Sequence, residues 1–213
     1  MASTASATGL SPIQEIVELG GEVIVKGLSK QQFCKLAEHY PELLMEREKN
    51  GTIYIMTPVK GGSGFRESKL SYYLTDWAVK EGRGMVFSPS TGFDLPDGAT
   101  KSPDVAWVSS EKMAQLRPEQ VEEEFIPAVP DFVAELRSKS DRLKKLQKKM
   151  KETWIKNGVR LAWLIDPYEE KAYIYRADGS REAVAGFDRQ LSGEEVLPGF
   201  VLALSEFRLL GKV

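Results

Sequence analysis

The sequence predicts an α/β protein in which helices flank a mixed β-sheet. Short apolar or alternating runs typical of strands recur along the chain, and segments with apolar residues at helical spacing separate them. The chain has 213 residues, 42% of them hydrophobic, so it can bury a substantial core as one domain. We therefore expect a single domain over residues 11–213, preceded by a disordered tail of residues 1–10.

Composition excludes several classes of function. The net charge of −2 gives no global attraction to nucleic acid, so any basic surface must be local. One cysteine, Cys34, and one histidine, His39, exclude a disulfide within the chain, a multi-Cys zinc site and a His-rich metal site. A Ser-His-Asp hydrolase would need His39, and no nucleophile-elbow motif accompanies it. No apolar run reaches the roughly 18 residues of a membrane span and no signal-peptide pattern is present, so we expect a cytoplasmic protein that does not bind membranes.

The N-terminal part is expected to hold an edge strand, a helix and a hairpin. Residues 22–26 have the composition of a short edge strand. Ser29 is a suitable N-cap for a helix that reaches about His39. Residues 43–55 are typical of a hairpin, because strand-like segments flank the tight-turn pair Asn50-Gly51.

The next stretch is interpreted as a linker, a helix and two strands. Residues 61–64, Gly-Gly-Ser-Gly, lack the spacing and the Lys-Ser/Thr ending of a phosphate-binding loop, so we interpret them as a linker. A core helix is predicted from about Phe65 to Lys80, with strands at residues 84–88 and 91–95 after it. Glu67 stands near the start of this helix, where the helix dipole alone favours an acid.

Two later strands carry acidic side chains. The strand Val105–Val108 follows directly after Asp104. In the strand Pro130–Arg137, Glu135 and Arg137 share one face because successive side chains alternate. A buried strand keeps such charges only when they are paired or bind a ligand. One interpretation is a structural Glu135–Arg137 ion pair, and the other is a Mg²⁺ site formed by carboxylates from adjacent strands.

Helical patterns flank the second of these strands. Residues 110–124 are expected to form one short helix that crosses the surface. Ser138 and Asp141 match a capping pattern, which predicts a helix from Ser138 to about Asn157. Most of its lysines are expected to be solvated. Lys149 is the exception, because this helix follows the Glu-x-Arg strand directly and one flank faces back toward it. The predicted apolar stripe of this helix consists of Leu143, Leu146, Met150 and Trp154.

The C-terminal third is expected to complete the sheet. Residues 160–166 form an apolar strand and residues 171–176 an alternating one. Trp163 is assigned to the core. A further short pair of strands is predicted at residues 182–184 and 195–197.

Longer motifs resemble a known family. Pro103-Asp104, a long gap and then Glu135-Leu136-Arg137 resemble the PD-(D/E)XK nuclease signature, with Arg at the usual Lys position. More specific are GFDLPDGATKSPDVAWV (92–108), VPDFVAELRSKSDRLKKLQKKMKETWIKNGVRLAWLIDP (129–167) and the KAYIYR that follows. Together these segments look like the bacterial Uma-type family, described as putative restriction endonucleases and formerly catalogued as a domain of unknown function. The resemblance runs from about Ser29 to Leu210.

The resemblance implies a fold, a reaction and a cofactor. The expected fold is a restriction-endonuclease-like core with an N-terminal helix and β-hairpin. The expected reaction is metal-dependent hydrolysis of DNA phosphodiester bonds. Its cofactor would be Mg²⁺, with Mn²⁺ as the alternative, held by Asp104, Glu135 and the backbone carbonyl of Leu136. Cutting a duplex needs two such sites, so a homodimer is expected.

The resemblance also assigns roles to three further residues. Glu67 would contribute to the metal site through water, and Arg137 would contact the scissile phosphate. Because Arg does not donate a proton at neutral pH, Lys149 is the candidate for orienting the attacking water or assisting the leaving oxygen.

Two alternatives belong to other classes of protein. One is a catalytically reduced nuclease-fold module that binds nucleic acid or a protein partner, which Arg137 at the usual Lys position favours. The other is a different acid-pair enzyme such as a glycoside hydrolase, with carboxyls about 5 to 10 Å apart. In the nuclease interpretation, contact with DNA falls to the basic helix at residues 142–151 and to loops, which implies salt-sensitive, largely nonspecific affinity.

Overall fold

The computed structural model describes residues 23–209 and 211. They form two compact units, one of residues 23–59 and 97–101 and the other of residues 60–96 and from 102 onward. The predicted single domain over residues 11–213 stays a prediction. The predicted tail and Glu22, the first residue of the predicted edge strand, lie outside the described residues.

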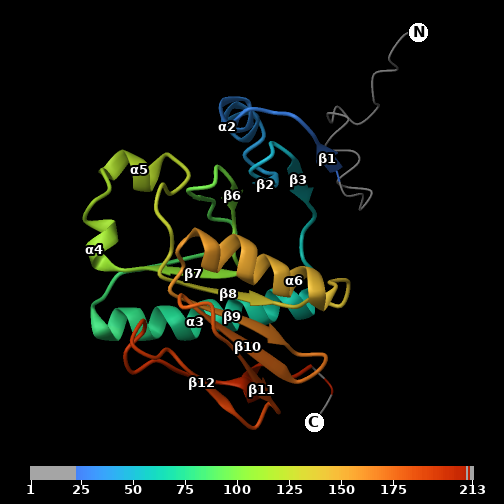
Figure 1. Cartoon of the computed structure of the whole chain (residues 1–213), viewed down its shortest axis with the longest axis vertical. Helices are drawn as coiled ribbons and strands as arrows, with labels where there is room; N and C mark the ends of the chain where they lie inside the picture. The colour runs from blue at the N-terminus through green and yellow to red at the C-terminus, as the bar shows by residue number, and fades with distance from the viewer. Residues whose placement is uncertain (1–22, 210, 212–213) are drawn as a thin grey trace. The chain divides into compact units, whose positions relative to one another are not determined.

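A small antiparallel sheet and one helix make up the first unit (Figure 1). The strands follow the order β1 (Val23–Val25), β3 (Ile53–Met56), β2 (Leu44–Arg47) and β6 (Thr100–Lys101). The helix α2 (Lys30–His39) begins after Ser29, whose hydroxyl accepts the Gln32 N–H while the Gln32 side chain accepts the Ser29 N–H. Gly51 adopts φ 82° in the turn between β2 and β3. The predicted strand, helix and hairpin are thus confirmed.

A six-stranded mixed sheet is the centre of the second unit (Figure 1). Its strands follow the order β11 (Arg181–Ala185), β10 (Lys171–Arg176), β9 (Leu161–Asp166), β8 (Phe132–Leu136), β7 (Val105–Val108) and β4 (Met85–Phe87). β8 and β9 run parallel, and the other neighbours run antiparallel. A parallel pair needs a long crossover, which the helical segment between the two strands supplies. The predicted mixed sheet flanked by helices is confirmed.

Helices cover both faces of this sheet. The helix α3 (Gly61–Glu81) buries Leu70, Leu74 and Trp77 in one cluster with Phe132 and Leu136 of β8. Because side chains alternate along a strand, Glu135 points to the opposite face. Three successive helical segments lie over that face: α6 (Leu143–Lys149), the π-helix η1 (Met150–Trp154) and the 3₁₀-helix η2 (Ile155–Asn157).

Shorter elements complete the second unit. They are β5 (Phe93–Asp94), α4 (Ser110–Met113), α5 (Pro118–Glu122), β12 (Gln190–Ser192), β13 (Val201–Ala203) and the 3₁₀-helix η3 (Leu204–Phe207). The C-terminal segment is fixed to α3, because Trp77 Nε1 donates to the Pro198 carbonyl at 3.0 Å and Lys69 pairs with Glu206 at 2.6 Å. Within residues 23–209 and 211, no helix combines the length and the apolar character that crossing a membrane requires.

The linker predicted at residues 61–64 is wrong, because these residues form the first turn of α3. Arg66, which is buried, fixes this turn by donating from Nη1 to the Gly62 carbonyl at 2.6 Å. Its Nε donates to the Phe207 carbonyl at 2.9 Å and its Nη2 to the Arg208 carbonyl at 3.3 Å. These contacts, distant in sequence, outweigh the low helix propensity of glycine.

The predicted start of the helix after β8 is also wrong. The Asp141 carboxylate accepts the Ser138 N–H at 2.8 Å, as the capping pattern suggests, but this bond closes a turn, and the helix begins at Leu143. The predicted end is confirmed, since Gly158 takes the left-handed conformation with φ 105° after Asn157. The π-turn inside the segment was not predicted.

Two further local predictions are wrong. Residues 110–124 form two short helices, because Pro118 starts a new helix at its N1 position. Residues 182–184 belong to β11 and pair with β10, whereas residues 195–197 form a turn and β12 pairs with β13. The strand predicted at residues 84–88 is confirmed as β4, and it pairs with β7.

Candidate active site

Asp104 and Glu135 lie where β7 begins and β8 ends. The two strands pair antiparallel with Val105 opposite Ala134, so the same register sets Asp104 opposite Glu135. Oδ2 of Asp104 accepts the Leu136 N–H at 2.6 Å. Glu135 is buried, whereas Asp104 keeps partial exposure. The structure therefore brings the two predicted acids together.

The groups that shift the pKa of Asp104 show which charged side chains lie near it. Burial raises the pKa of Asp104 well above its usual range, and the negative charge of Glu135 raises it further. The Leu136 N–H and the positive charge of Lys149 oppose this rise, while Glu67 adds a smaller upward contribution. The pKa of Glu67 is itself raised by burial. Glu135, Glu67 and Lys149 thus lie within electrostatic reach of Asp104, and the two acids oppose the ionisation of Asp104.

The Leu136 carbonyl lies beside the same pair of acids. Backbone polar groups alternate in direction along β8: the Arg137 N–H donates toward β9, to the Ile165 carbonyl at 2.9 Å, whereas the Leu136 N–H turns toward Asp104. The carbonyl of Leu136 points to the same side as its N–H, and the register sets Pro103 opposite it. Proline has no N–H to donate to this carbonyl. The Leu136 carbonyl is therefore a third oxygen atom at this end of the β7–β8 pair.

These oxygen atoms fit a magnesium ion. In the described part of the chain, no three or more His, Cys, Asp and Glu side chains form a group that could hold a metal ion. The oxygen atoms that the two strands bring to this place are those of the Asp104 and Glu135 carboxylates and of the Leu136 carbonyl. Mg²⁺ takes oxygen ligands, keeps several waters, and is commonly bound by one or two carboxylates together with a substrate phosphate.

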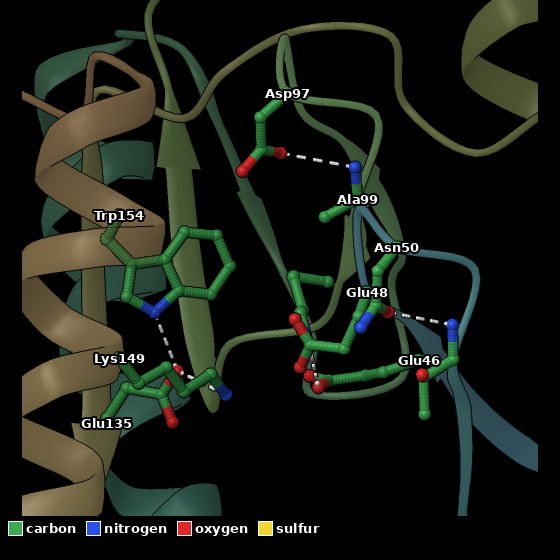
Figure 2. Close-up of polar contacts among 10 residues, drawn as sticks. Glu46, Glu48, Asn50, Asp97, Ala99, Glu135, Lys149 and Trp154 are labelled. Atoms are coloured by element: carbon green, nitrogen blue, oxygen red, sulfur yellow. Dashed lines mark hydrogen bonds and ion pairs between the residues drawn. The ribbon is translucent and has the colours of Figure 1, made fainter. Parts of the chain in front are cut away.

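Lys149 and Trp154 both contact Glu135 from the helical segment above it (Figure 2). Lys149 Nζ lies 2.8 Å from Oε1 of Glu135, and Trp154 Nε1 donates to the same oxygen at 2.8 Å. In an α-helix, two residues five positions apart point roughly 140° away from each other. The π-helix η1 starts directly after Lys149, and its wider i→i+5 turn brings Lys149 and Trp154 to one side. Sequence reasoning missed the role of Trp154, because its spacing also suits a purely apolar stripe.

The guanidinium of Arg137 pairs with Asp166 and not with Glu135. Its Nη1 lies 2.6 Å from Oδ2 of Asp166, which is fully buried, and its Nε donates to the Asp141 carbonyl at 3.2 Å. The structural Glu135–Arg137 ion pair considered above is wrong, since the structure forms two separate pairs, Glu135 with Lys149 and Arg137 with Asp166. The alternation that would set Glu135 and Arg137 on one face ends with β8 at Leu136.

Comparisons with known proteins give a family and a fold. A family model named Uma2, described as "Putative restriction endonuclease", matches residues 31–205. A similar solved structure is the crystal structure of a putative nuclease belonging to DUF820 from Anabaena variabilis ATCC 29413, with a TM-score of 0.69 and 19% sequence identity. That match covers 85% of this chain and 97% of the other, and at this identity it shows the fold alone. The comparison with curated proteins gives no match.

Proposed function

The chain belongs to the Uma2 family, and from this premise we propose that it is a metal-dependent endonuclease that hydrolyses phosphodiester bonds of DNA. The observation that carries the proposal is the pairing of two acids on adjacent strands, Asp104 opposite Glu135, with the pKa of Asp104 raised by burial and by the charge of Glu135. Two such carboxylates are stabilised in their ionised forms by a bridging cation.

Mg²⁺, or Mn²⁺, held by Asp104, Glu135 and the Leu136 carbonyl would neutralise charge on the scissile phosphate and make an attacking water more acidic. The protein's own groups supply orientation and proton transfer. Lys149 lies beside Glu135 and is only partly exposed, so its ammonium can hold the attacking water in line or donate a proton to the leaving oxygen. Glu67 would accept a hydrogen bond from a water in the site.

Trp154 acts through Glu135. Its indole N–H and the Lys149 ammonium contact the same carboxylate oxygen, which fixes the rotation of the carboxylate. Residues that orient a metal-binding side chain through such hydrogen bonds commonly change the metal affinity by about 10- to 100-fold when they are mutated. We therefore assign Trp154 as a positioning residue and Lys149 as the catalytic cation.

The phosphate contact predicted for Arg137 stays a prediction, and its pairing with the buried Asp166 supports a structural role instead. A homodimer belongs to the proposal, because cutting both strands of a duplex needs two sites. A cytoplasmic location also stays part of the proposal.

Cleavage of supercoiled plasmid and of single-stranded DNA in Mg²⁺ or Mn²⁺ tests this function. The wild type is compared with Asp104→Ala and Glu135→Ala, and with Glu123→Ala, which removes an exposed acid outside the site. We expect metal-dependent nicking that both site variants reduce at least about a hundredfold and the control leaves unchanged. A wild type that cuts nothing, or site variants that cut equally well, would support the catalytically reduced binding module instead.

A further inference from the structure

A pocket lies on another side of the helical segment that carries Lys149. It has a volume of about 430 Å³ and is bordered by the helical stretch 147–155 and by the turn between β10 and β11. Lys148, which lines it, points about 100° around the helix from Lys149. The pocket is therefore separate from the carboxylate pair, although one helix borders both.

The charged groups that line this pocket are mostly cations. They are Lys148, Lys151, Arg176 and Arg181, together with the single carboxylate of Glu152. The chain as a whole has a net charge of −2, so this pocket concentrates positive charge against the general balance. Such a concentration of positive charge attracts anions.

Two of these cations are free to take an anion. Lys148 and Lys151 are exposed, and neither has a carboxylate partner in the described part of the chain. Arg176, in contrast, is held by Glu194 at 2.6 Å and Glu182 at 2.8 Å. Glu152 is partly neutralised by Lys156 at 3.5 Å, which reduces its repulsion of an anion.

A buried hydroxyl also lines the pocket. Tyr175 is 5% exposed, and its hydroxyl is enclosed by the protein. The exposed Arg181 guanidinium lies near this hydroxyl and lines the same pocket, and a guanidinium matches the oxygens of a phosphate well.

We propose that this pocket binds a backbone phosphate of the nucleic-acid substrate, away from the bond that is cut. The inference rests on the proposed function and names a second contact with the same substrate. Lys148 and Lys149 point about 100° apart on a helix that is about 10 to 12 Å across with its side chains, so the two sites lie roughly 8 to 9 Å apart. Successive nucleotides advance about 3.4 Å along a strand, and the pocket would therefore hold a phosphate a few nucleotides from the carboxylates. This contact would fix the position of the strand at Asp104 and Glu135.

Salt-dependent DNA binding tests the inference without any cleavage. Labelled single-stranded and duplex oligonucleotides are titrated in EDTA, with fluorescence anisotropy at several salt concentrations. The double variant Lys148→Ala, Lys151→Ala is expected to lower the slope of log affinity against log salt by about one and to weaken binding about fivefold at low salt. The double variant Lys80→Ala, Arg189→Ala removes the same charge from exposed positions that do not line the pocket, and its slope should equal that of the wild type.

Free phosphate is the other source of the same chemical group. Calorimetric titration with inorganic phosphate at constant ionic strength distinguishes the two sources. Phosphate binding that requires Lys148 and Lys151, together with an unchanged DNA slope, would assign the pocket to a small ligand and overturn the inference.

The outcomes also separate this inference from the proposed function. If the wild type cleaves DNA but the pocket variant keeps the control's salt slope, only the inference fails. A wild type that neither binds nor cleaves DNA contradicts both. A lower slope for the pocket variant, in a protein that binds DNA but does not cleave it, supports the pocket while the proposed reaction fails.

Discussion

Glu135 occupies a buried strand position, where a carboxylate is stable only with partners. Lys149 and Trp154 supply two contacts to its Oε1, and Asp104 stands opposite it on β7. The sequence alone predicted that Asp104, Glu135 and Lys149 would come together. It gave no reason to pair Arg137 with Asp166, because that contact depends on where β9 ends relative to β8.

The raised pKa of Asp104 predicts a pH-dependent stability of the metal-free protein. In the unfolded chain an aspartate has a pKa of about 4, whereas the pKa of Asp104 in the folded protein is higher. The contribution of Asp104 to the free energy of unfolding should therefore fall as pH rises from about 4 through the folded pKa. Asp104→Asn has no carboxyl group to titrate, so it removes this pH-dependent fall in the free energy of unfolding. Its amide oxygen can still accept the Leu136 N–H. In urea unfolding with EDTA, the wild type should lose stability relative to Asp104→Asn between about pH 4 and pH 7. A difference that stays constant with pH would contradict the raised pKa.

Substitutions of Lys149 and of Arg137 should change different properties: the first the cleavage rate, the second the free energy of unfolding. Lys149→Arg keeps a positive charge near Glu135 but not a proton donor, so the cleavage rate should fall by a factor of about 10² or more. Arg137→Met leaves Asp166 buried without its cation and should lower the free energy of unfolding by about 3 kcal/mol.

Single-turnover cleavage and urea unfolding of both variants measure the two effects. The cleavage rate of Arg137→Met, corrected for its folded fraction, should stay within a few fold of the wild type. A loss of activity in folded Arg137→Met as large as that in Lys149→Arg would restore the phosphate contact predicted for Arg137.

At the level of elements, the π-turn η1 determines the geometry of the site. It allows Lys149 and Trp154, five residues apart, to contact one oxygen of Glu135. Local signals in the sequence predicted where this helical segment ends, at Gly158, because a left-handed glycine is a local requirement. The π-turn could not be predicted, since it is stabilised by contacts with Glu135 that the local pattern does not contain.

Trp154→Phe removes the indole donor to Glu135 and keeps most of the buried ring. We expect the apparent metal affinity to fall by a factor of about 10 to 100. The measurement is the Mn²⁺ concentration that gives half of the metal-induced rise in Tm. Trp163→Phe is the matched control, because Trp163 is equally buried and its Nε1 makes no hydrogen bond with any described residue. Equal losses of metal affinity in both variants would attribute the effect to lost volume alone.

The first turn of α3 depends on Arg66. Its guanidinium donates to the carbonyls of Gly62, Phe207 and Arg208, although four residues of low helix propensity begin the helix. Arg66→Met should lower the free energy of unfolding by about 2 to 4 kcal/mol, because it removes three hydrogen bonds of a charged group and leaves the buried Phe207 carbonyl without this donor. Urea unfolding measures this loss. Lys69→Met, which breaks a half-exposed pair with Glu206, should cost at most about 1 kcal/mol. A smaller loss for Arg66→Met than for Lys69→Met would contradict the anchoring role of Arg66.

For the whole molecule, the order of the strands was the least predictable feature. The strands at residues 105–108, 161–166 and 171–176 were predicted within a residue or two, because their apolar or alternating patterns are local. The pairing of β4 with β7 and of β12 with β13 joins segments whose sequences contain no mutual signal. The family resemblance, and not the local pattern, supplied the expected arrangement of the core.

The central claim is that the Asp104–Glu135 pair is a divalent metal site. The most direct measurement is a crystal structure grown with Mn²⁺, with an anomalous difference map recorded for wild type and Asp104→Asn. The account predicts one strong peak within coordination distance of the carboxylates of Asp104 and Glu135 and of the Leu136 carbonyl, and a weaker or absent peak in the variant. Saturating Mn²⁺ with no peak at this position, or a peak of equal height in Asp104→Asn, would contradict it.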